Sequence, residues 1–103
     1  MRLCNINYIP GQEFDIIGLV KGNTVQCKNI GKDIGAGFRN LAGGEMKGYT
    51  EMLQDAREIA TQRMIAEASK LGADAIIEVT YSSAAITQGA AEVIAYGTAV
   101  KFR

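Results

Sequence analysis

The chain has 103 residues, of which 48% are hydrophobic, 21% are charged and one is proline. This composition is typical of an ordered globular protein, and the length predicts a single domain over residues 1–103. Eleven basic residues balance eleven acidic ones, so no net charge attracts nucleic acid or an anionic membrane, and we expect neither as a partner.

The first residues, MRLCNINYIPG, lack the apolar run of a signal peptide, and no stretch approaches the ~20 apolar residues that span a bilayer. We therefore expect a cytoplasmic protein. Cys4 and Cys27 are not in CxxC spacing. Two cysteines in a cytoplasmic chain are usually free thiols, which disfavours a disulfide between them.

Two strands are predicted before residue 31. The dipeptide Pro-Gly at residues 10–11 predicts a turn, because proline fixes its own φ and glycine accepts a positive φ. Residues 14–21, FDIIGLVK, are rich in β-branched side chains and predict a strand with Ile16 and Val20 on the same face. Residues 25–30 alternate weakly and predict a short edge strand.

The segment from Gly31 to Gly48 is dense in glycine. Ile34, Phe38 and Leu41 have helical spacing within it and predict about two turns of helix. Glycine loops present amide donors to anions, so the run GKDIGAGFRN has the composition of a phosphate cradle, but its spacing matches neither a P-loop nor a dinucleotide fold. We therefore favour a structural role, in which the glycines allow tight contacts between subunits.

Residues 50–71 carry the strongest periodic signal in the chain. Apolar side chains recur there at steps of three and four, which predicts an amphipathic helix. Thr50 is predicted as the N-terminal cap and Gly72 as the left-handed residue that ends the helix. The apolar stripe comprises Leu53, Ala56, Ala60, Met64, Ala68 and Leu71.

Residues 73–82 and 92–103 are predicted as the remaining strands. In the first of them, Ile77 and Val79 are expected on one face. The last strand alternates most clearly, with a small face and a larger one. The small face comprises Val93, Ala95, Gly97 and Ala99, and the larger face Ile94, Tyr96, Val100 and Phe102.

A strand, a long helix and a strand form a crossover unit, so strand 1 (residues 14–21) and strand 2 (residues 73–82) should be parallel. Strand 3 (residues 92–103) should then lie antiparallel between them. We predict an α+β fold, a two-layer βαββ arrangement with sheet order 1-3-2, one long helix on the small face and extra short elements for assembly. The larger face then has no cover from its own chain. Because contiguous exposed apolar surface usually marks an interface, we predict an obligate homo-oligomer.

The motifs IPG, GLVKGN, GKDIGAGFRNLAGGEMKGY, DAREIATQRMIAEASKLGADAIIEV and YGTAVKF occur in this order. In this the chain resembles the YbjQ-like family, whose members are also called heavy-metal-binding domains. The resemblance implies a dodecin-like βαββ subunit in a ring, generally a pentamer, with a heavy-metal ion as the candidate cofactor. Family members often carry aspartates in the strand where this chain has Glu78, Thr80, Ser82 and Ser83, and that departure argues against an acidic metal site.

Four residues are candidate site residues. Cys27 is the candidate metal ligand, because thiolates bind zinc and copper(I) and a ring brings several copies together; the alternative is a small apolar filler. Arg39, Tyr49 and Tyr96 are candidate ligand-binding residues at subunit interfaces. The alternative is that Arg39 pairs with a carboxylate and that the tyrosines bury their rings at an interface.

The chain contains no histidine, so it cannot form a Ser-His-Asp or Cys-His arrangement, and metal ligands would be thiolates or carboxylates. Glu51, Asp55 and Glu58 are interpreted as a solvated helix face rather than as paired acids. The sequence thus favours a non-enzymatic cytoplasmic ring with any ligand sites at its subunit junctions. The alternatives are a heavy-metal-binding or redox-responsive protein, and an enzyme that uses carboxylates at an interface.

Overall fold

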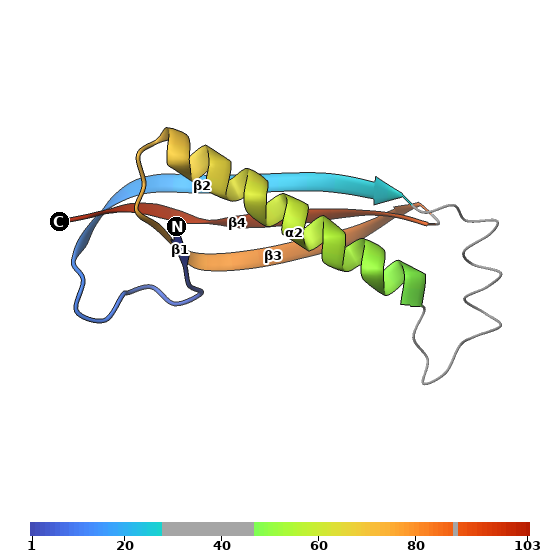
Figure 1. Ribbon diagram of the computed structural model, residues 1–103, viewed down its shortest axis with the longest axis horizontal. Helices are drawn as coiled ribbons and strands as arrows, with labels where there is room; N and C mark the ends of the chain where they lie inside the picture. The colour runs from blue at the N-terminus through green and yellow to red at the C-terminus, as the bar shows by residue number, and fades with distance from the viewer. Residues whose placement is uncertain (28–46, 88) are drawn as a thin grey trace.

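The computed structural model describes residues 1–27, 47–87 and 89–103. These residues form one helix packed on one face of a mixed sheet, which confirms the α+β class (Figure 1). The predicted helix over residues 34–41 lies outside the described residues. In chain order the elements are β1 Arg2–Leu3, β2 Phe14–Cys27, α2 Lys47–Lys70, β3 Ala75–Thr87 and β4 Ala90–Phe102.

The sheet has the order β1-β3-β4-β2. Its three long strands follow the predicted arrangement: β4 is antiparallel to both β2 and β3, which are therefore parallel to each other. The fourth strand was not predicted. β1 pairs in parallel with Ala75 and Ile76 of β3 over two residues, too few to produce a periodic signal in the sequence.

β2 is one strand of 14 residues. The prediction of separate strands over residues 14–21 and 25–30 was wrong, because the chain remains in one strand between residues 21 and 25. The sequence KGNT at residues 21–24 suggested a break, yet β2 pairs with β4 without interruption from Gly18 to Cys27. Gly22 is buried under the helix and Thr24 is buried beside it. The glycine therefore serves close packing rather than a turn.

α2 begins at Lys47, three residues before the predicted cap Thr50, which lies inside the first turn. The helix ends as predicted: Gly72 has φ +76°, the amide of Ala73 donates to the carbonyl of Ala68, and the amide of Gly72 donates to that of Ser69. This is the hydrogen-bond pattern of a Schellman cap. Leu71 falls in this cap and is 52% exposed, so its predicted place in the apolar stripe was wrong.

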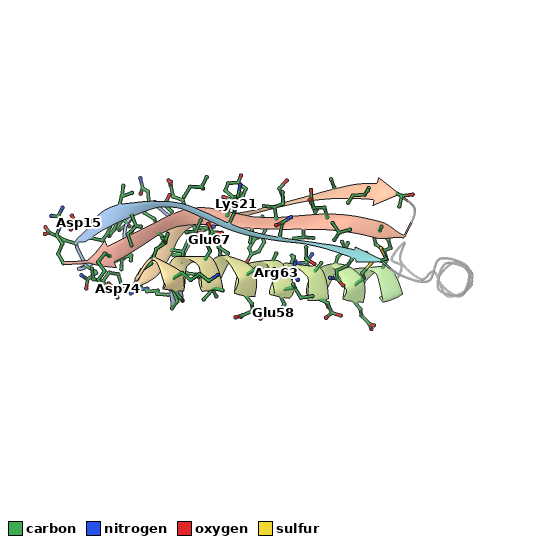
Figure 2. All side chains as sticks on the ribbon, turned by 90° about the horizontal axis from the view of Figure 1, so that it is seen from above. Asp15, Lys21, Glu58, Arg63, Glu67 and Asp74 are labelled. Atoms are coloured by element: carbon green, nitrogen blue, oxygen red, sulfur yellow. The ribbon has the colours of Figure 1, made fainter. Side chains whose placement is uncertain are left out.

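α2 packs chiefly against β2 and β4 (Figure 2). Its buried side chains recur every four residues and meet the small face of β4, as predicted. A Cβ added to Gly22 would overlap the backbone nitrogen of Met64 and the carbonyl oxygen of Ala60. The helix stripe comprises Met52, Ala56, Ala60, Met64 and Ala68, and the small face of β4 supplies Val93, Ala95 and Ala99.

Two irregularities change the predicted alternation of side chains. The register of β2 against β4 shifts between Ile16 and Gly18, so Ile16 lies on the face opposite to Val20. A second shift in β3 follows Ile77, where Glu78 has φ +53°. Ile77 consequently packs on the face away from the helix, whereas Val79 packs on the helix side. The shift in β2 coincides with Gly18, which has φ +153° and is the residue type that often marks a bulge, whereas the shift at Glu78 has no sequence signal.

We predict that Gly22→Ala destabilises the fold by about 1 to 3 kcal/mol, because the added methyl forces α2 away from β2. The measurement is chemical denaturation at matched protein concentration.

Gly48→Ala is the matched control, since a Cβ at this position in the first turn of α2 meets nothing within 4 Å. Alanine has the higher helix propensity, so this variant should gain up to about 1 kcal/mol. Equal stability of Gly22→Ala and the wild type would contradict the close approach.

Candidate functional site

In the described part of the chain, the face of the sheet away from α2 has no element packed on it over most of its length. We call it the open face and define it by β2 positions Leu19, Lys21, Asn23 and Val25, β4 positions Glu92, Ile94, Tyr96 and Thr98, and β3 positions Thr80 and Ser82. The strand registers place these side chains in cross-strand rows on one side of the sheet. Lys21, for example, lies opposite Tyr96, which lies opposite Thr80.

Large apolar side chains are exposed on and beside the open face. Leu19 is 67% exposed, Val25 49% and Tyr96 39%, and Ile16 at the margin is 69% exposed. Polar side chains lie between them, and the charged ones on the open face are Lys21 and Glu92. Lys21 lies on the side of the sheet opposite to the helix in Figure 2. The face thus combines apolar contact area with separated charges of opposite sign, as interfaces commonly do.

One end of this side of the sheet is covered, which corrects the expectation that Val100 and Phe102 lack cover. Val100 is fully buried and Phe102 is partly buried. Ile9, from the turn that residues 9–12 form, packs with Val100, Ala75 and Ile77 in a second small core. The N-terminal segment therefore closes this end and leaves the open face beyond it.

Ion pairs also lie at the end of the sheet that Ile9 covers. Asp74 accepts a hydrogen bond from the amide of Phe102 (2.8 Å) and lies 3.5 Å from Lys101 Nζ. Arg103 pairs with Asp15 at 2.8 Å and with Glu13 at 3.6 Å. Sequence reasoning missed these contacts, because they join residues far apart in the chain. They are exposed pairs, and each contributes no more than about 1 kcal/mol.

The candidate residues Tyr49 and Tyr96 are not brought together within one chain. Tyr96 lies on the open face, whereas Tyr49 belongs to the first turn of α2, on the other side of the sheet. Arg39 lies outside the described residues. Any pocket that contains both tyrosines must therefore use Tyr49 from one copy and Tyr96 from another.

Cys27 is the last residue of β2 and is exposed. It follows the open-face positions of β2 in register and lies opposite Ala90. Cys4 is half-buried beside β3, and its Sγ lies 3.8 Å from the carbonyl oxygen of Ile6. The amide of Cys4 donates to the carbonyl of Ile76. Ile76 lies opposite Ala99 of β4, which in turn lies opposite Gly18 of β2. Cys27 lies nine residues farther along β2, about 30 Å away, so the two thiols cannot pair within one chain.

No cluster of three or more Cys, Asp or Glu side chains within the described ranges is arranged to hold a metal ion. Glu51, Asp55 and Glu58 are exposed on α2, Glu58 accepts a hydrogen bond from Gln62, and Figure 2 shows Glu58 directed away from the sheet. These acids form the outer, solvated side of the helix. No described helix is long and apolar enough to cross a membrane.

Comparison with known proteins gives the family. The sequence profile of the YbjQ family, described as "Putative heavy-metal-binding", matches residues 1–103. The chain belongs to this family. It is 58% identical over 101 residues to a UPF0145 protein of Clostridium novyi (strain NT), covering 98% of each chain. It is also 53% identical over 104 residues to a UPF0145 protein of Halorubrum lacusprofundi, covering 100% of each.

A solved structure has the same fold. It is a protein of unknown function from Pediococcus pentosaceus ATCC 25745, assigned to the DUF74 family, with a TM-score of 0.69 and 17% sequence identity. The match covers 100% of this chain and 98% of that one. At this level of identity the likeness concerns the fold alone.

We predict that Cys27 reacts with a small thiol reagent faster than Cys4, because Cys27 is exposed and Cys4 is half-buried. Reaction of the folded protein with Ellman's reagent should show a fast phase that Cys27→Ser removes and Cys4→Ser retains. A fast phase that survives in Cys27→Ser would contradict this placement of the two thiols.

Proposed function

We propose that this YbjQ-family chain works as a cytoplasmic, non-enzymatic homo-oligomer in which the open face is buried between copies. The observation that carries the proposal is the exposure of Leu19, Val25 and Tyr96 on one side of a sheet whose other side packs against α2 along β2 and β4. Contiguous exposed apolar surface of this kind usually marks an interface.

The energetic argument rests on the size of the exposed side chains. Burying a large apolar side chain contributes about 1.5 to 3 kcal/mol when it passes from full exposure to full burial. The four large side chains on and beside the open face retain between 39% and 69% of their exposure in one chain. A neighbouring copy that covers them gains a substantial part of this free energy, whereas an isolated chain leaves it unrealised.

We infer a ring, and we take five as the copy number that the family resemblance implies. A ring uses the same two surfaces of every copy and closes without unpaired ends. Ligand sites, with Arg39, Tyr49 and Tyr96 as candidates, then lie at the junctions. One chain holds Tyr49 and Tyr96 on opposite sides of the sheet, so a pocket that contains both needs two copies.

Leu19→Asp should break the assembly, because it puts an unpaired carboxylate into the contact. Burial of an unpaired charge costs several kcal/mol, so we expect the dissociation constant to rise at least about 100-fold. Light scattering coupled to size-exclusion chromatography measures the mass at each protein concentration.

Ala66→Asp is the control, because Ala66 is exposed on α2 and receives the same charge outside the open face. It should keep the mass of the wild type. If folded Leu19→Asp keeps the mass of the wild type, the open face is not part of the contact between copies.

A heavy-metal-binding function is the second candidate, and the exposed thiol of Cys27 favours it. A tetrahedral zinc or copper(I) site needs more ligands than the described residues of one chain group together, so symmetry would have to bring Cys27 from several copies together. Under this alternative, protein purified without chelator carries metal at no more than one ion per two chains.

The metal alternative predicts that Cys27→Ala loses the ion completely and that Cys4→Ala retains it. Elemental analysis by mass spectrometry of both variants beside the wild type gives the ratio of metal to chain. Absence of a thiophilic metal from all three samples, after incubation with zinc and gel filtration, would retire this function.

A further inference from the structure

The outer edge of β3 is protected over its first half only. β1 pairs with Ala75 and Ile76, and beyond them the amides of Glu78 and Val79 donate to the carbonyls of Ile6 and Cys4, both at 3.0 Å. Past Val79, no described residue pairs with this edge. The unprotected part is the seven-residue segment Tyr81–Thr87, all of it exposed, and we call it the distal edge of β3.

The direction of the free backbone groups follows from the contacts of Val79. Its amide points outward to Cys4, and because Val79 follows the irregularity at Glu78, the alternation of backbone groups along the rest of the strand is counted from Val79. Tyr81, Ser83 and Ala85 therefore direct their amides and carbonyls outward, whereas Ser82 and Ala84 direct theirs toward β4. The distal edge thus offers three donor–acceptor pairs to a further strand.

The sequence of the distal edge, YSSAAIT, contains no charged residue and no proline. Exposed sheet edges are normally protected by lysine, proline, short length or cover, because an open edge accepts any strand. The opposite edge of the sheet differs. On β2, the Arg63 guanidinium donates to the carbonyl of Asn23 at 2.7 Å, and Lys21 adds a charge nearby.

The two edges match in position. Val93 of β4 lies opposite both Ser83 and Thr24, and Ala90 of β4 lies opposite both Thr87 and Cys27. The distal edge and the end of β2 therefore lie at the same position along the strand axis, on the two opposite edges of the sheet. β2 and β3 run in the same direction. Rotation about an axis along the strands therefore brings the distal edge of one copy beside β2 of the next, as a parallel pair.

We propose that the distal edge of β3 pairs in parallel with the segment Lys21–Cys27 of β2 in the neighbouring copy, and that this pairing is the seam of the ring. The inference rests on the proposed homo-oligomer and names its contact. The second copy is the fitting occupant because each chain carries both margins at the same height, and the uncharged edge meets Lys21 without a like charge. The carbonyl of Asn23 retains a second lone pair, so the Arg63 bond is compatible with the pairing.

The pairing is tested by proline at an outward position. Ser83→Pro removes an amide that no described group of the same chain uses, so each chain should stay folded while native mass spectrometry shows the loss of the full ring. Ser82→Pro is the matched control, since it removes an amide that bonds β4 and should lower the unfolding temperature instead. A folded Ser83→Pro protein that keeps the mass of the wild type overturns the proposal.

Disulfide trapping gives a second test that does not depend on proline. In a Cys4→Ser background, Thr87→Cys places a thiol level with the natural Cys27 and on the same face as it. Mild oxidation should give a ladder of linked chains up to the ring size, because each copy joins the next head to tail. Cys27→Ser in this background should abolish the ladder.

The outcomes separate the seam from the proposed function. Linked dimers only, or linkage that persists without Cys27, would show pairing between identical edges and overturn the parallel seam. An unchanged mass in Ser83→Pro together with dissociation of Leu19→Asp would leave the homo-oligomer standing and remove the seam. A wild type that is a folded monomer contradicts both.

Discussion

α2 lies so close to β2 at Gly22 that a methyl group there would overlap the backbone of Ala60 and Met64. The remaining architecture depends on this contact. It is possible because the buried stripe of the helix is mostly alanine and the facing strand β4 is small at every second position. A helix seated this deeply buries the side chains of β2 and β4 that face it and gives no cover to the other side of the sheet.

The other side of the sheet is exposed because the strands are long. Strands of 13 and 14 residues are longer than most, and the N-terminal segment with Ile9 covers only one end of them. Beyond that cover, the open face and the distal edge of β3 remain as adjoining surfaces. One is apolar side-chain surface and the other is unpaired backbone, and both are features that proteins normally bury. Under the proposed homo-oligomer, the function of this fold belongs to the junctions between copies.

The arrangement of the long elements could be predicted from the sequence, since helical period, Gly72 and the alternation of β4 are all local signals. The irregularities could not. Gly22 has the sequence context of a turn, and only the position of the helix shows that it is a packing residue. The register shift at Glu78 interrupts an apolar run whose composition fits either alternation of side chains, and the shift in β2 lies at Gly18, which the prediction treated as an ordinary strand residue. Cover by Ile9 depends on a contact across most of the chain.

The candidate site was less accessible to sequence reasoning, for a physical reason. Tyr49 and Tyr96 were chosen by residue type, but a single chain holds them on opposite sides of the sheet. The distal edge of β3 carries no charged side chain and, among the described residues, has no partner strand, and neither feature forms a sequence motif. A site formed between two copies contains residues that are not close together in either chain. The pattern and spacing of one sequence therefore do not define such a site.

Native mass spectrometry of the unmodified protein, purified without chelator and diluted through the micromolar range, tests the central claim most directly. The account predicts one assembly of several identical chains, with five as the expected number, that persists on dilution. A folded single chain across this range would show that the open face needs no neighbour and would contradict the account.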